Sequence, residues 1–146
     1  MYSFSGASIS PGAKTFSVEY FKNNAPSIQP TLSNLLTESL KDKITGETNL
    51  TLSNNGELQF QGEITDYRVS PIAIQANETA AQNRLTITIK AKFINKIEES
   101  NNYSTSFSHY IDFDSTEELA LIENELNDEL VEIMCDKIFN KAFSNW

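Results

Sequence analysis

Two side chains of this chain are suited to nucleophilic or acid–base chemistry: its one histidine, His109, and its one cysteine, Cys135. A catalytic thiol–imidazole pair needs these two groups in contact. His109 falls on the same side of an alternating, strand-like segment as Phe107 and Ile111. Cys135 lies within an apolar series at helical spacing, where a small thiol is ordinarily part of the core. We therefore interpret both residues as structural and expect a non-enzymatic protein.

The acidic residues do not follow the pattern of a metal site. Asp112, Asp114 and Glu117 are close together, but the glycine that an EF-hand calcium loop requires is missing. They are more simply explained as the end of a strand and the cap of a helix. A structural zinc site needs several cysteine and histidine ligands at short spacing, and this chain has one of each. We expect no metal and no other cofactor.

The charge of the chain restricts its partners. Its 20 acids and 11 bases give a net charge of −9, and no two basic residues are adjacent. Proteins that bind nucleic acid by neutralising phosphates carry a basic face, so we expect no nucleic-acid partner. No segment approaches the roughly 20 consecutive apolar residues that a membrane-spanning helix needs.

Alternation of apolar and polar residues predicts the strands. In residues 15–21 it places Phe16, Val18 and Tyr20 on one side. The pair Asn55–Gly56 separates two further alternating segments and predicts a hairpin, because such turns need positive φ at both positions. The clearest strand covers residues 85–94, and the last covers residues 105–114.

Helical spacing predicts two amphipathic helices. The first runs from Leu32 to Ile44, with Gly46 placed for a left-handed C-terminal cap. The second is longer and begins after a capping-box pair formed by Ser115 and Glu118. Together with the strands, they predict a single α+β domain over residues 1–146, with residues 1–14 as an irregular arm. We expect a two-layer sandwich, in which two helices cover one face of a mostly antiparallel sheet of about four strands.

The connection at residues 70–84 is long for a link between two strands. It carries the apolar residues Ile72 and Ile74, which predict a contact surface for a partner. An extension of the hairpin is the alternative interpretation of the same residues.

Segments in a fixed order along nearly the whole chain carry a resemblance to a known family. They are YSFSGASI at 2–9, TFSVEYF at 15–21, PTLS at 30–33, LKDK at 40–43, LQFQGEITDY at 58–67, SPIAI at 70–74, NRLTI at 83–87, IFNKA at 138–142 and NW at 145–146. In these segments the chain resembles the lipopolysaccharide-assembly lipoprotein family LptE, in its Bacteroidetes-type form.

The resemblance implies a location and a partner. Family members are anchored to the periplasmic face of the outer membrane by a lipidated cysteine, which we expect upstream of Met1 and outside this chain. They act as plug and assembly factor of a large outer-membrane β-barrel, LptD, and are thought to bind lipopolysaccharide. The family fold, two helices on a four-stranded sheet, agrees with the fold expected from the residues. The alternative is a periplasmic lipid-binding carrier module without a barrel partner.

Lipopolysaccharide is anionic, so direct binding by a chain of net charge −9 requires a local basic patch. Lys90 and Lys92 share the outward side of the clearest strand, and Arg84 lies at its entry. Lysine stems can lie along acyl chains while the ammonium groups meet phosphates. These three residues are therefore the candidate lipopolysaccharide site. The alternative is that they are ordinary solvated strand residues.

Overall fold

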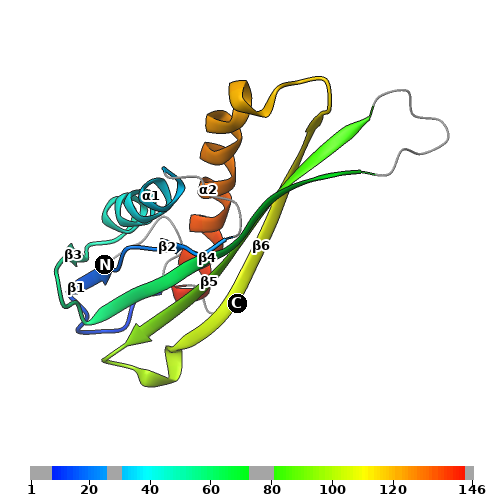
Figure 1. Cartoon of the computed structure of the whole chain (residues 1–146). Coiled ribbons are helices and arrows are strands. Elements are labelled where there is room, and N and C mark those ends of the chain that lie inside the picture. The colour runs from blue at the N-terminus through cyan, green and yellow to red at the C-terminus, as the bar shows by residue number, and fades with distance from the viewer. Residues whose placement is uncertain (1–7, 26–30, 73–80, 144–146) are drawn as a thin grey trace.

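The computed structural model describes residues 8–25, 31–72 and 81–143 and forms a sheet with both helices on one face (Figure 1). The elements are β1 (Thr15–Val18), β2 (Lys22–Asn23), α1 (Leu32–Glu47), β3 (Thr51–Leu52), β4 (Leu58–Pro71), β5 (Gln82–Asn95), a 3-10 turn (Glu99–Asn101), β6 (Tyr103–Asp114) and α2 (Leu119–Phe143). The predicted α+β class is confirmed. Within the described ranges, however, the sheet has six strands rather than four and is mixed.

The additional strands are short and parallel to their neighbours. The strand order is β3-β1-β4-β5-β6, and β2 pairs with β4 beyond the end of β1. β1 runs parallel to both β3 and β4, whereas β4, β5 and β6 are antiparallel. The sheet therefore has a short parallel part and a long antiparallel part.

The hairpin predicted at Asn55–Gly56 is wrong, because β1 lies between the two segments that the turn was expected to pair. Positive φ occurs in the described residues only at Gly12, so the turn chemistry is also different. A Cβ atom on Gly56 would lie 2.4 Å from the carbonyl carbon of Phe16. Gly56 therefore serves the close approach of β1 rather than a left-handed turn.

Three other local predictions need correction. Tyr20 is 57% exposed, because β1 ends at Val18 and does not continue the alternation. Gly46 lies inside α1, and the backbone N–H and the hydroxyl of Thr48 close the helix on the carbonyl of Ile44. α2 begins at Leu119 rather than after Ser115.

The turn before α2 is organised by an aspartate instead of the predicted capping box. The carboxylate of Asp114 accepts hydrogen bonds from the backbone N–H and the hydroxyl of Thr116, at 2.9 and 2.8 Å. These bonds lower the pKa of Asp114, because they favour its charged form. The chain therefore makes a side-chain-stabilised turn before it enters the helix.

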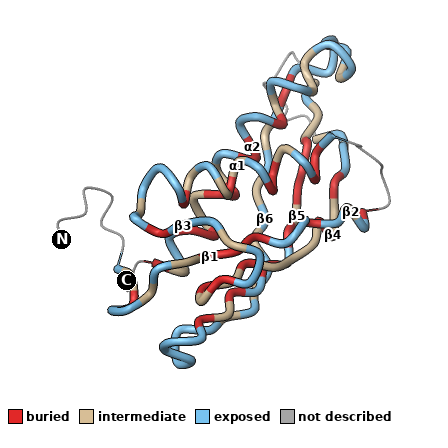
Figure 2. Tube along the Cα trace, turned by 90° about the vertical axis from the view of Figure 1, so that its left-hand side faces the viewer, coloured by how far each residue is buried: buried red, intermediate tan, exposed pale blue. Residues whose placement is uncertain are grey.

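The core lies between the sheet and the helices, and buried residues alternate with more exposed ones along β4 and β5 (Figure 2). At its centre the Phe60 ring lies 4.9 Å from that of Phe93 and 5.8 Å from that of Phe143. Phe93 and Phe143 lie 6.0 Å apart, in an edge-to-face arrangement that aromatic rings favour. Neither described helix is long and apolar enough to cross a membrane.

The three long strands continue beyond the predicted boundaries. β4 extends to Pro71 and β5 begins at Gln82, and the backbone N–H of Ile72 still donates to the carbonyl of Gln82 at 2.9 Å. The pairing of β4 with β5 shifts between Ile64 and Asp66, whereas β5 and β6 pair without interruption. These strands therefore form the regular surface on which the candidate site lies.

Candidate functional site

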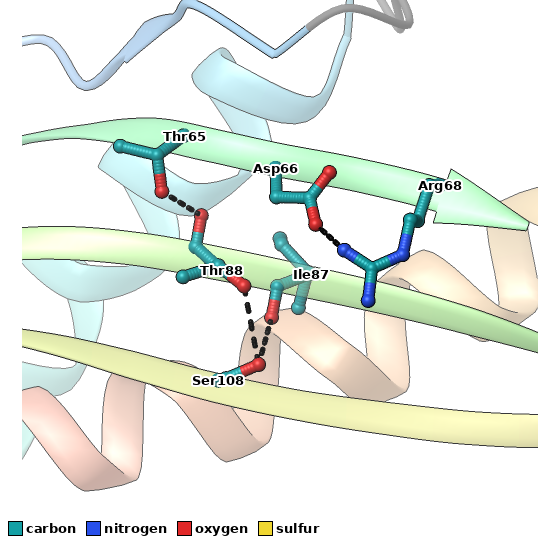
Figure 3. Close-up of polar contacts among 6 residues, drawn as sticks. All are labelled: Thr65, Asp66, Arg68, Ile87, Thr88 and Ser108. Atoms are coloured by element: carbon teal, nitrogen blue, oxygen red, sulfur yellow. Dashed lines mark hydrogen bonds and ion pairs between the residues drawn. The ribbon is translucent and has the colours of Figure 1, made fainter.

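The candidate site is the open face of the sheet, defined here as the side of β4, β5 and β6 that points away from the helices. Its side chains follow from the register: Lys90 lies opposite Ser106, Lys92 opposite Ser104, and Arg84 opposite Asp112. Figure 3 views part of this face, with the helices behind the strands. The predicted outward direction of Lys90 and Lys92 agrees with their exposure.

The open face is electrically balanced although the chain is acidic. Four bases and four acids point from it. The bases are Arg68, Arg84, Lys90 and Lys92, and the acids are Glu63, Asp66, Asp112 and Asp114. Much of the acid excess lies on α2, which carries six acids and two bases. An anionic ligand approaching the open face therefore does not meet the full net charge of −9.

Arg84 is occupied by neighbours within the face. Its Nε and Nη2 atoms donate to the two carboxylate oxygens of Asp112, at 2.8 and 3.1 Å. Its guanidinium also lies 3.8 Å from the centre of the Tyr110 ring, and that tyrosine is 49% exposed. The hydrogen bonds to Asp112 raise the pKa of Arg84. Arg84 is therefore a partly neutralised cation.

Lys90 and Lys92 are exposed and lie elsewhere on the face. Within the described parts of the chain, neither has a carboxylate within ion-pair distance. Glu63 on β4 lies directly opposite Lys90, and its carboxylate accepts a hydrogen bond from the side-chain amide of Asn24. Six residues of strand, about 20 Å, separate Arg84 from Lys90. Of the three predicted residues, Lys90 and Lys92 therefore lie close together without an ion-pair partner, whereas Arg84 is distant from them and bound to Asp112.

Short hydroxyl side chains connect the three strands between these two positions. The Ser108 hydroxyl donates to the carbonyl of Ile87 at 3.3 Å and lies 3.1 Å from the Thr88 hydroxyl (Figure 3). The Thr65 hydroxyl donates to the carbonyl of Thr88 at 3.3 Å, and Arg68 pairs with Asp66 on the same face. Hydroxyl and ammonium groups are donors of the kind that bind phosphates and sugars, which makes this face the candidate site.

Of the two predicted contact residues, Ile72 lies directly after β4. Ile72 is half-buried and follows the last residue of β4, so the hairpin extension is real up to this point. Ile74 lies outside the described residues. Apolar surface near this part of the chain includes Val69 on β4, and Leu121 near the start of α2 is 81% exposed.

His109 and Cys135 occupy different environments. Cys135 is buried, its thiol lies 3.9 Å from the carbonyl of Leu36 on α1, and burial raises its pKa to about 12. His109 is half-buried on β6, with its ring 6.0 Å from that of Tyr110. A thiol with this pKa is protonated at neutral pH and is a poor nucleophile. The described residues also include no cluster of three or more acidic, histidine or cysteine side chains placed to hold a metal ion.

One polar cluster has no signal in the sequence. The Tyr67 hydroxyl on β4 lies 2.6 Å from a carboxylate oxygen of Glu123 and 2.8 Å from the side-chain oxygen of Asn127. Asn127 is only 2% exposed, although it lies in a helix of acidic appearance. The cluster links the first half of α2 to β4.

The fold defines a two-layer α+β protein with helices on one face of the sheet and a polar open face on the other. Residues 13–142 match the LptE family, described as lipopolysaccharide-assembly, and the chain belongs to this family. No curated protein sequence matches the chain.

Solved structures share this fold at low sequence identity. A minor lipoprotein from Acinetobacter baumannii is 14% identical, with a TM-score of 0.55, and the match covers 90% of this chain and 96% of that one. A protein from Xanthomonas campestris is 10% identical, with a TM-score of 0.53 and coverage of 92% and 91%. A neuraminyllactose-binding hemagglutinin homolog from Helicobacter pylori is 9% identical, with a TM-score of 0.52 and coverage of 97% and 91%. At these identities the likeness shows the fold alone.

Proposed function

We propose that this protein is a non-enzymatic outer-membrane lipoprotein that assists the assembly of lipopolysaccharide as the plug and assembly factor of the LptD barrel. The observation that carries this proposal is the match of residues 13–142 to the LptE family. The fold is also shared with a protein described as a minor lipoprotein. A lipidated cysteine upstream of Met1 would anchor the protein to the periplasmic face of the outer membrane.

Direct contact with lipopolysaccharide is assigned to the open face, and first to Lys90 and Lys92. Both ammonium groups are exposed and have no ion-pair partner among the described residues, so little must be displaced before they bind a phosphate. Ser106 and Ser104 lie opposite these lysines on β6, and their hydroxyl groups can donate to sugar or phosphate oxygens. Arg84 belongs to the same proposed site, but it contributes less because Asp112 already binds its guanidinium.

Contact with the barrel is assigned to Ile72, which directly follows β4, and to Ile74. Ile72 is half-buried and directly follows β4, and the nearby Val69 on the same strand is 41% exposed. Apolar side chains grouped at one end of a protein are typical of an interaction surface. The second candidate function is a lipid-binding carrier that acts without a barrel, because the open face is accessible without any partner.

The proposal is tested by purifying the tagged full-length lipoprotein from native outer membranes in mild detergent. We expect equimolar LptD in the purified sample, and lower recovery for an Ile72→Asp variant. Ile97→Asp is the matched control, since Ile97 is an exposed isoleucine in a different loop, and it should leave recovery unchanged. Absence of LptD from the wild-type sample would reject the plug role. Retained lipopolysaccharide binding in that case would favour the carrier.

A further inference from the structure

The two edges of the described sheet differ greatly in length. One edge is β3, which has two residues, and the other is β6, which has twelve. β6 pairs with β5 in an unbroken register from Tyr103, opposite Phe93, to Asp114, opposite Gln82. A long and regular edge offers unpaired backbone groups to another strand.

The register shows which backbone groups of β6 face outward. In an antiparallel pair, every second residue exchanges hydrogen bonds with the neighbouring strand. Ser115 continues the register of β6, and its backbone N–H donates to the carbonyl of Ala81, which lies opposite it. The odd-numbered residues of β6 are therefore the ones that bond to β5. In agreement, the carbonyl of the even-numbered Ser108 accepts a hydrogen bond from the Lys137 side chain on α2, at 3.2 Å. The outward groups therefore belong to the even-numbered residues, and they include those of Ser104, Ser106, Ser108, Tyr110 and Asp112.

This edge lacks the usual protection against pairing. Natural edge strands are commonly kept free by lysine, proline, a bulge or short length. β6 contains no lysine, arginine or proline and has no register shift, whereas β4 shifts its pairing with β5 at Ile64. Its even-numbered side chains are exposed, and the Lys137 contact is the one hydrogen bond that the described residues make to the outward groups between Ser104 and Asp112.

The helix-facing side of β6 is also incompletely covered. Tyr103, Phe107 and Ile111 pack against the core but stay partly exposed. Their partners on β5 are fully or almost fully buried, with Ile89 opposite Phe107 and Leu85 opposite Ile111. An added strand with apolar side chains on this side would bury the exposed parts of Phe107 and Ile111.

We propose that β6 binds an extended segment of the barrel partner as an additional strand of the sheet. This inference rests on the proposed function and specifies where the partner binds. The outward N–H and C=O groups can pair with the backbone of an added strand. Because one side of β6 is partly apolar and the other is polar, the added strand should alternate apolar and polar residues. A closed barrel has no free strand edge, so the segment belongs to a loop or a terminal extension of the partner.

Charge distinguishes this segment from a second copy of the chain. β6 carries Asp112 and Asp114 and no base, which favours a basic residue at that end of the bound segment. A second copy offers the same acids and a net charge of −9. A symmetric pair centred on the middle of β6 would also bring Lys137 of each copy together beside Ser108.

Amide hydrogen exchange on the free protein and on its purified complex with LptD tests the inference. In the free protein we expect fast exchange at Ser104, Ser106, Tyr110 and Asp112, and slow exchange at the odd-numbered residues. In the complex the even-numbered amides should slow by about tenfold or more, while the odd-numbered amides stay slow.

A proline substitution tests the same edge independently. Ser106→Pro removes an outward N–H and leaves the donors to β5 in place, so we expect binding of LptD to weaken by about tenfold or more. Ser106→Ala keeps the N–H and should bind as the wild type does. If the complex forms and the even-numbered amides still exchange quickly, the inference is wrong while the plug role stands. If no complex forms, the plug role itself fails. Even-numbered amides that are already protected in a dimer of the free protein would mean that a second copy occupies the edge.

Discussion

The two sides of β5 lie in different environments, one buried and one exposed. On one side Leu85, Ile87 and Ile89 are fully buried under the helices. On the other side Arg84, Lys90 and Lys92 reach the open face. Because side chains alternate with a period of two, each substitution on β5 affects either the core or the proposed binding surface, and the next residue along the strand affects the other. The covered face should therefore control stability, and the open face should control binding.

The largest effect is expected at the aromatic centre of the covered face. Phe93→Ala removes a buried ring that packs against Phe60, Tyr103 and Phe143. We expect the free energy of unfolding to fall by about 3–5 kcal/mol, measured by urea denaturation. Lys92→Ala, one residue away on the open face, should change it by less than about 0.5 kcal/mol. Similar losses for the two variants would contradict the division between the faces.

Alanine substitutions at two separate glycines, Gly62 and Gly46, give the next comparison of stability. A Cβ atom on Gly62 of β4 would lie 2.3 Å from the carbonyl oxygen of Lys90 and 2.6 Å from the Phe21 ring. Gly62→Ala should therefore lower the free energy of unfolding by about 1–3 kcal/mol, because the strand must shift. Gly46 lies within α1 and has open space around it, so Gly46→Ala should raise stability by about 0.5–1 kcal/mol. Thermal melts of both variants measure the opposite signs, and a Gly62→Ala variant as stable as the wild type would contradict the close approach of Lys90 and Phe21 to Gly62.

The buried polar cluster should have a smaller effect. Tyr67→Phe removes the hydroxyl beside Asn127 and Glu123, which leaves polar groups of a buried asparagine less satisfied. We expect a loss of about 1–2 kcal/mol in chemical denaturation. Tyr110→Phe, at a half-exposed tyrosine on the open face, serves as control and should stay within about 0.5 kcal/mol. A neutral Tyr67→Phe variant would mean that the cluster does not hold α2 in place.

The open face should show the reverse behaviour, with little effect on stability and a clear effect on binding. Reversing both charges in Lys90→Glu/Lys92→Glu should leave the melting temperature nearly unchanged, because both side chains are exposed. Binding of purified lipopolysaccharide should weaken by about tenfold or more, measured by titration at fixed salt. The charge-matched control is Lys41→Glu/Lys141→Glu, which makes the same change in net charge on α1 and α2 and should leave binding unchanged. Unchanged binding in the double variant would remove these lysines from the site.

Local patterns in the sequence predicted the parts of the molecule that depend on neighbouring residues. The outward direction of Lys90 and Lys92 and the helix from Leu32 follow from periodicity, which each segment carries by itself. The position of β1 between β3 and β4 does not, because the pairing of a four-residue strand is decided by distant partners. The neutralisation of Arg84 was missed for the same reason, since Asp112 reaches it only through the register of β5 and β6.

We propose that this protein assists the assembly of lipopolysaccharide at the outer membrane, from where lipopolysaccharide becomes exposed on the cell surface. The most direct test of this claim is the amount of surface-exposed lipopolysaccharide in cells from which the protein is depleted, measured with a reagent that does not enter the cell. We expect the surface amount to fall as the protein disappears and to recover when the wild-type protein is restored. An unchanged surface amount after complete depletion would contradict the claim.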